Sequence, residues 1–290
     1  MLIGIHLGLT YAFGLLLGKV FNINKENTQK LAILASIFGI LPDLDFFIDL
    51  VAGSNVHRYL THSVVIGLWL CILLIMQKRQ VIISILGSLM IFMILWIFLK
   101  NGSIYSALII ITFLFIFFIC SYLAFIALKP NHCNTSIIFI GILVPYLSHV
   151  IFDSIVGGST IFFPIPSLLT GNLYWFKVNV FPETGTLPIS FWILEIFGAL
   201  SAIYGMVIYQ GYELRQINTN VVFTSFIATI AFYLVDYNYM LSIDLVMGLI
   251  AVYVICTMIL KIFKPKVMFA IMSTWFGFCL LMIIFSVLRL

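Results

Sequence analysis

The stretch "LAILASIFGILPDLDFFIDL", residues 31–50, is long and apolar enough to cross a membrane, yet its second half carries three aspartates. A helix needs about 20 apolar residues to span a bilayer. An ionised side chain inside the bilayer is costly unless it is paired, so intramembrane acids are usually functional. Both the fold and the candidate site are therefore sought first in this segment.

The composition of the whole chain agrees with a membrane location. Of its 290 residues, 63% are hydrophobic and 8% are charged, whereas about 25% of the residues in a soluble domain are charged. The sequence predicts an all-α polytopic membrane protein with about ten transmembrane helices. The expected spans lie near residues 3–20, 30–50, 62–76, 81–99, 104–128, 136–155, 187–209, 219–235, 241–260 and 267–288.

The longest interruption between spans, about 157–186, is rich in Gly, Pro and aromatic residues, and all five histidines precede it. We therefore expect two parts. Residues 1–186 would form a metal-site core of about six helices plus an interfacial loop, and 187–290 a C-terminal bundle of about four transmembrane helices.

The basic residues are unevenly placed. With an even number of spans both termini lie on one side, and ten of the 14 Lys and Arg residues fall on the other. Because cytoplasmic loops carry the excess of positive charge, we expect an integral plasma (inner) membrane protein with both termini outside. The net charge of +4 is small, so the expected partners are membrane lipids and not nucleic acid. The oligomeric state does not follow from the sequence.

Four groups of polar residues fall at span ends that face one side of the membrane. They are His6, "LPDLD" (41–45), "HRYLTHS" (57–63) and "SHVIFD" (148–153). The predicted topology brings them together on the outer, extracytoplasmic face, although the sequence separates them by up to about 150 residues.

Residue spacing and residue type predict the local structure of three of these groups. His149 and Asp153 are four residues apart, so on a helix both project from one stripe. Pro42 lacks an N–H and would disrupt the helix just before Asp43. Thr61 is expected to cap a helix that starts at His62.

Imidazoles together with carboxylates suit a divalent ion such as zinc, with manganese or iron as alternatives. One or two ions are expected, with carboxylates bridging them if there are two. The candidate ligands are the acids and histidines of the four groups: His6, Asp43, Asp45, His57, His62, His149 and Asp153. A simple ion pair of Asp43 or Asp45 with Arg58 would leave the other groups unexplained. Three roles are expected for Glu195, which lies about two turns into the seventh span. It completes the site, acts as a base or makes an interhelical hydrogen bond.

An early His followed by "LPDLD", "HRxxTHS", "SHxxxD" and "FPIPS" (163–167) resembles the YdjM-like family of membrane-bound metal-dependent hydrolases, over roughly residues 1–190. The polar residues of the family correspond here to His6, Asp43, Asp45, His57, Arg58, His62, Ser63, His149 and Asp153. The resemblance implies metal-dependent hydrolysis. A more distant similarity to zinc-dependent phospholipases C and nucleases implies a phosphoester substrate.

The leading hypothesis is a metal-dependent hydrolase that acts on an ester or phosphoester, most simply in a lipid, at the outer membrane interface. Arg58 would bind the phosphate of the substrate, and Asp45 or Glu195 would serve as general base. Two alternatives use the same ligands: a divalent-cation transporter and a non-catalytic metal-binding membrane protein.

Overall fold

The computed structural model describes residues 4–45, 61–75, 87, 117, 119–131, 133–156, 189–213 and 265–288, and within these residues all regular structure is helical. This confirms the all-α class for that part of the chain. The helices are η1 (Gly4–Leu9, a π-helix), α1 (Thr10–Val20), α2 (Lys25–Ile40), η2 (Leu41–Asp45, a 3-10 helix), α4 (Val64–Ile75), Ile119–Leu128, α7 (Thr135–Val156), α9 (Ile189–Gly205), η3 (Met206–Gln210, a π-helix) and α12 (Pro265–Leu288).

In the part of the chain that the structure describes, three helical segments are long and apolar enough to cross a membrane: Thr135–Ser154, Trp192–Gln210 and Lys266–Ile284. The shorter apolar helices are Gly4–Val20, Val64–Ile75 and Ile119–Leu128. The expected spans near 219–235 and 241–260 lie outside the described residues, as do nearly all of the 81–99 span, most of the 104–128 span and the loop at 157–186. The count of ten spans therefore stays a prediction.

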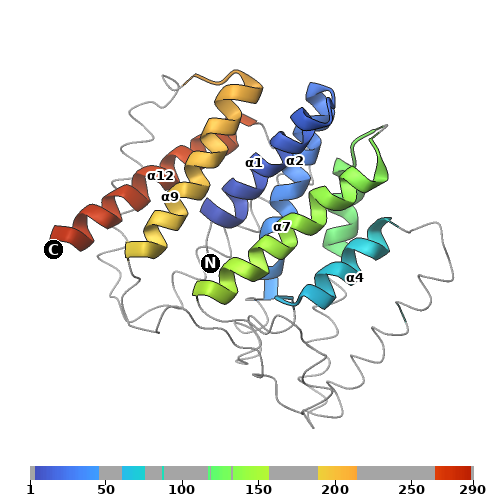
Figure 1. Ribbon diagram of the computed structural model, residues 1–290, viewed down its shortest axis with the longest axis horizontal. Helices are drawn as coiled ribbons and strands as arrows, with labels where there is room; N and C mark the ends of the chain where they lie inside the picture. Colours follow the sequence, from blue (N-terminus) through green and yellow to red (C-terminus); the bar gives the residue numbers. More distant parts are fainter. Residues whose placement is uncertain are drawn as a thin grey trace, which may run out of the picture.

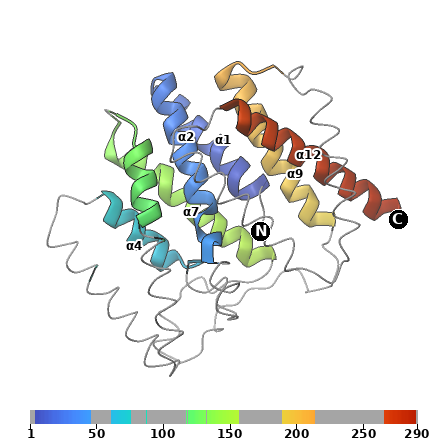
Figure 2. The same ribbon diagram turned by 180° about the vertical axis from the view of Figure 1, so that it is seen from behind.

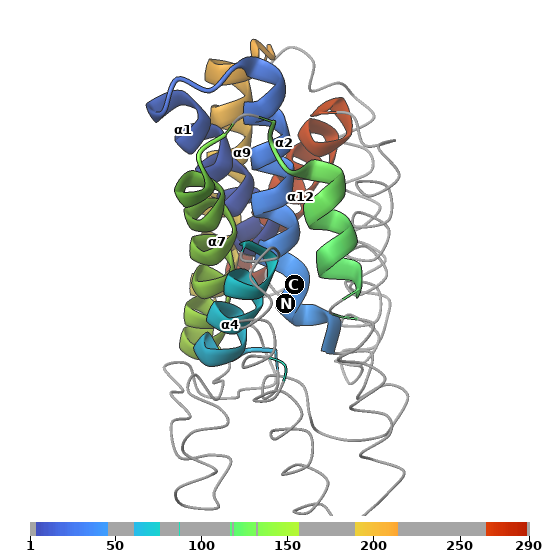
Figure 3. The ribbon, with the colours of Figure 1, turned by 90° about the vertical axis from the view of Figure 1, so that its right-hand side faces the viewer.

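The helix pair α1 and α2 stands in the middle of the described helices (Figure 1). It is flanked by α7 and α4 on one side and by α9 and α12 on the other, as the view from behind also shows (Figure 2). α2 packs along α7, and the side view shows the two helices next to each other (Figure 3). η1 packs mainly against α9 and α2, so the first residues described lie between the two halves of the bundle.

The ends of α2 follow from its sequence. At the start, the Asn24 side chain accepts a hydrogen bond of 2.9 Å from the Asn27 N–H, which is a helix N-cap. At the end, the α-helix stops at Ile40 and the chain continues as the 3-10 turn η2, which contains Pro42. A proline cannot donate the backbone hydrogen bond that would extend an α-helix. The predicted interruption before Asp43 is therefore confirmed.

One face of α9 is apolar and exposed. Its exposed large side chains recur every three or four residues, and the same stripe continues into η3: Ile193, Phe197, Leu200, Tyr204 and Ile208. The opposite face is buried against η1 and α12. A soluble protein rarely exposes a continuous apolar stripe of this kind, so the helix surface agrees with contact with lipid.

Close backbone contact between η1 and α9 depends on glycine. A Cβ atom on Gly198 would lie 2.1 Å from the Gly4 carbonyl oxygen, and a Cβ on Gly4 would lie 2.1 Å from the Glu195 carbonyl oxygen. Backbone atoms in packed helices cannot move aside as a flexible side chain can. The two glycines therefore set how closely η1 approaches α9.

We predict that Gly198→Ala destabilises the protein by about 1–3 kcal/mol, because the added methyl group overpacks a backbone contact. Gly205→Ala, in the same helix, is the control, since the nearest atom to its Cβ is a Leu15 side-chain carbon at 3.2 Å. Thermal unfolding of both variants in detergent would test this. Equal melting temperatures would contradict the prediction.

Candidate metal centre

Helix α7 presents His149 and Asp153 on one face, as their spacing of four residues predicts. Both side chains are buried. Both oxygens of Asp153 contact histidines: Oδ1 lies 2.8 Å from His6 Nε2, and Oδ2 lies 3.0 Å from His62 Nε2. One carboxylate thus connects α7 with η1 and with the segment that precedes α4.

Hydrogen bonds of Thr61 place His62 in the site. The Thr61 hydroxyl donates to the Pro42 carbonyl oxygen at 2.6 Å, and the Tyr146 hydroxyl of α7 donates to the Thr61 carbonyl oxygen. Residue 61 is therefore fixed to both η2 and α7. His62 follows directly and lies between Asp43 and Asp153.

The expected role of Thr61 as a helix cap is wrong. The helix α4 begins at Val64, and the Ser63 side chain accepts a hydrogen bond of 3.1 Å from the Val65 N–H. Ser63 is therefore the capping residue, two positions after Thr61. The Thr61 hydroxyl instead donates to Pro42, a tertiary contact between residues 19 positions apart.

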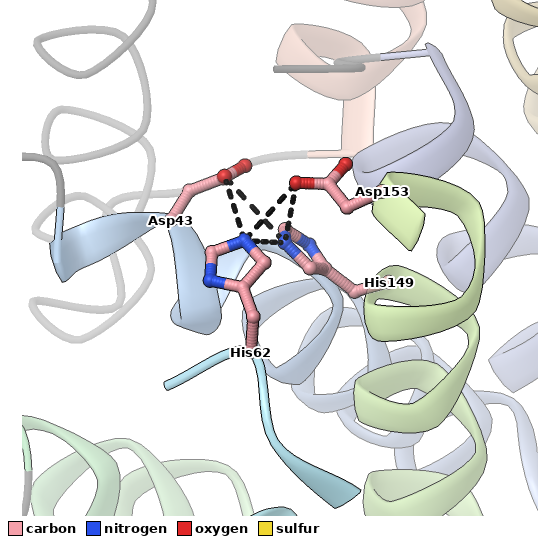
Figure 4. Close-up of side chains that lie close together, drawn as sticks. All are labelled: Asp43, His62, His149 and Asp153. Atoms are coloured by element: carbon pink, nitrogen blue, oxygen red, sulfur yellow. Dashed lines mark hydrogen bonds and ion pairs between the residues drawn. The ribbon is translucent and has the colours of Figure 1, made fainter. Parts of the chain in front are cut away.

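Asp43, His62, His149 and Asp153 converge, with one potential ligand atom from each lying within 4.8 Å of the others. Figure 4 shows the two imidazoles between the two carboxylates. The two Nε2 atoms are 3.0 Å apart, and Asp43 Oδ1 lies 3.5 Å from His149 Nε2 and 3.6 Å from His62 Nε2. Ligand atoms around a tetrahedral zinc ion, bound at about 2.0 Å, are separated by about 3.3 Å. The four side chains could hold one such ion.

Asp43 provides an independent test of this fit. Both of its carboxylate oxygens are buried and have no hydrogen-bond partner among the described residues. A buried carboxylate without donors is strongly unfavourable. A divalent cation would satisfy it, and two carboxylates with two neutral imidazoles would balance the charge of that cation. The donor set therefore fits a metal ion, whose identity the geometry leaves open.

The backbone carbonyl of Gly39 orients His149. His149 Nδ1 lies 2.6 Å from this oxygen, and because a carbonyl only accepts, Nδ1 carries the proton. In the neutral ring Nε2 is then an unprotonated acceptor that faces His62 and the two aspartates. Metal-ligating histidines usually place their second N–H on such an acceptor.

His6 lies beside the four residues but is not one of them. Its ring stacks on His149, with ring centres 3.7 Å apart and planes inclined by 27°, and its Nε2 contacts the Asp153 oxygen that points away from His62. Its Nδ1 is buried without a hydrogen-bond partner in the described part of the chain. The prediction that His6 is near the site is confirmed, and its role as a ligand stays a prediction.

Glu195 is in a separate place. Its Oε2 accepts hydrogen bonds from the Gly4 N–H at 2.7 Å and from the Trp275 indole at 2.5 Å, so it joins α9 to η1 and α12. The group of four potential ligands does not include it. Of the roles expected for Glu195, the interhelical hydrogen bond is the one observed.

His57 and Arg58 lie outside the described residues, and so does the side chain of Asp45. Their predicted roles stay predictions.

Sequence reasoning missed Gly39 and Tyr146, which orient His149 and anchor residue 61. Gly39 acts through its backbone, which leaves no signal in the sequence. The sequence did contain one indication for Tyr146: it carries a hydroxyl and lies three residues before His149, on the same face of the span.

We predict that Asp43→Ala weakens the affinity for a divalent metal more than about a hundredfold, because it removes one of four ligands. Ser148→Ala is the matched control, since Ser148 is next to His149 and its hydroxyl donates to the Pro145 carbonyl oxygen. Metal content after purification, combined with competition against a chelator, would measure both. Similar metal content in the two variants would contradict the prediction.

We predict that Glu195→Ala lowers the stability by about 1–3 kcal/mol, because it leaves the buried N–H of Gly4 and the partly buried indole N–H of Trp275 without their acceptor. Glu195→Gln keeps an acceptor oxygen and should be milder. Metal content should remain unchanged in both variants. Unfolding curves and elemental analysis on the same samples would check this, and loss of metal with retained stability would contradict it.

Comparison with known proteins places the chain in a family. No curated protein and no solved structure matched it. The family described as YdjM inner membrane protein matches residues 1–240, well over half of the chain and beyond the expected boundary at residue 186. Together with its apolar helices, this match shows that the chain belongs to the YdjM family of inner membrane proteins.

Proposed function

We propose that this protein is a membrane-embedded metal-dependent hydrolase that cleaves an ester or phosphoester bond, in a lipid, at the outer interface of the membrane. The main support is the unsatisfied carboxylate of Asp43, which faces two imidazole nitrogens and a second carboxylate deep among apolar helices. We propose zinc as the metal, with manganese or iron as alternatives, because mixed nitrogen and oxygen ligands suit these ions.

The described residues would bind and orient the ion. Asp43, His62, His149 and Asp153 would hold it, and the Gly39 carbonyl keeps Nε2 of His149 free of a proton. A divalent ion in this place would acidify a water molecule and so supply the nucleophile near neutral pH. The two carboxylates neutralise the ion, which lowers the cost of keeping it in an apolar interior.

The location near one end of the helices supports an interfacial substrate. His6 and Asp43 lie at one end of the pair formed by η1–α1 and α2, whereas Lys19 and Lys25 lie at the opposite end. The positive-inside rule would put the lysine end in the cytoplasm and the metal centre toward the outer face. On α7, Ile151 is exposed between the buried His149 and Asp153. Lipid can therefore contact α7 on the face opposite His149 and Asp153.

The remaining catalytic roles rest on residues outside the group of four. We assign the general base to Asp45 in preference to Glu195, because Oε2 of Glu195 binds Gly4 and Trp275 and Glu195 lies outside the group of four potential ligands. Arg58 would bind the phosphate of the substrate through paired N–H donors. Both assignments follow from the sequence motifs "LPDLD" and "HRYLTHS".

One observation favours a second candidate, a non-catalytic protein with a structural metal. All four potential ligands are 0–1% exposed, and closed sites with four protein ligands are typical of structural zinc. If the metal is structural, chelators should lower the melting temperature, and the protein should show no catalytic turnover with or without metal. The hydrolase requires that a substrate and a water molecule reach the metal.

We predict that the purified protein, loaded with zinc, hydrolyses phospholipids or simpler phosphoesters, and that His62→Ala combined with Asp153→Ala lowers the rate about a thousandfold or more. Release of the product from defined vesicles would measure this, with Ser148→Ala as the control. Turnover that survives the double substitution would rule out this site. A stable, metal-loaded wild-type protein without turnover on any ester would favour the structural metal.

A further inference from the structure

The three histidines that the structure describes at the site differ in what their second ring nitrogen contacts. His149 Nδ1 lies 2.6 Å from the Gly39 carbonyl oxygen, and His62 Nδ1 lies 3.5 Å from the Thr61 hydroxyl. His6 Nδ1 is buried and has no hydrogen-bond partner among the residues that the structure describes. This difference separates the function of His6 from that of the other two.

The position of the single proton on a neutral imidazole follows from these contacts. If His6 Nε2 bound a metal, the proton would be on Nδ1, where a buried N–H would have no acceptor. If Nε2 carries the proton, it donates to Asp153 Oδ1 at 2.8 Å and leaves only a bare acceptor at Nδ1. A ligating histidine almost always has an acceptor for its second N–H. The second arrangement is therefore the better satisfied one.

We propose that His6 is a positioning residue for Asp153 and not a metal ligand. Its N–H fixes Oδ1 of the carboxylate, which directs Oδ2 toward His62, and its ring supports the imidazole of His149 by stacking. This inference rests on the proposed metal centre. It assigns one ion to the described cluster, with Asp153 as a terminal ligand and not as a bridge to a second ion held by His6.

The backbone around His6 is fixed independently of its side chain. The Thr10 hydroxyl donates to the His6 carbonyl oxygen, and Gly39 packs so closely that a Cβ there would lie 2.2 Å from the same oxygen. Substitutions of the imidazole should therefore leave η1 in place. This makes side-chain variants at this position informative.

The test compares His6→Gln with His6→Ala in the full-length protein in detergent. The amide nitrogen of Gln is as many bonds from Cα as Nε2 of His, so Gln can donate to Asp153, but an amide is a poor ligand for zinc or cobalt. Ser36→Ala is the control, because Ser36 is buried and, among the described residues, its hydroxyl donates only to the carbonyl oxygens of Leu7 and Ala32.

Zinc affinity and stoichiometry would be measured by competition with a chromophoric chelator, and ligand geometry by the absorption spectrum of the cobalt-loaded protein. We expect one ion per chain in every case. Affinity should fall about 10–100-fold in His6→Ala, as for the loss of other residues that orient metal ligands. It should stay within about threefold of wild type in His6→Gln and Ser36→Ala, with the wild-type cobalt spectrum retained in His6→Gln.

Two results would overturn the proposal. One is His6→Gln binding as weakly as His6→Ala. The other is two ions in the wild-type protein and one in both variants, which would make His6 a ligand. A wild-type protein that binds no metal would remove the metal centre along with this inference. A metal-loaded protein with the expected affinities but no hydrolysis would overturn the hydrolase proposal alone.

Discussion

The carboxylate of Asp153 is the interaction on which the centre of this structure depends. It is buried in a helix that is long and apolar enough to span a membrane, and its two oxygens contact histidines from two other parts of the chain. A charge in such surroundings is tolerated only when it is paired. The close contact of α2 with η1 and the anchoring of residue 61 bring the partners within reach.

The same helices connect the site to the second half of the chain. η1 carries His6 toward Asp153 on one side, and on the other side Glu195 and Trp275 hold the backbone N–H of Gly4. α9 and α12 are therefore not merely added to a complete core, because they fix the segment in which His6 lies. The family match, which continues to residue 240, agrees with a unit larger than the first six spans.

Much of the site could be predicted because its signals are local. The spacing of His149 and Asp153 requires only helix periodicity, and Pro42 marks the interruption that turns Asp43 away from α2. Their convergence with His62 follows from counting spans, since alternate span ends meet at one membrane face. These inferences need only the order of the segments along the chain and their helical character, and both can be inferred from a single sequence.

The features that were not predicted depend on contacts in three dimensions. Thr61 looked like a helix cap because a hydroxyl before an apolar run is typical of one, but it donates its hydrogen bond to the carbonyl oxygen of Pro42, 19 residues earlier. The Gly39 carbonyl orients His149 across 110 residues, and any residue type would offer the same oxygen. For Glu195 the sequence left three roles open, and the interhelical hydrogen bond depends on the positions of Gly4 and Trp275. In each case the partner is defined by packing, which the sequence does not show directly.

The long separation between the partners also has a consequence for biosynthesis. His6 and Asp153 are 147 residues apart, which corresponds to roughly 7–30 s of translation at typical rates. During that interval η1 and α2 have been synthesised, while the carboxylate that His6 contacts has not yet been made. The centre can close only after α7 has been synthesised, so the order of synthesis determines when Asp43 first meets His149.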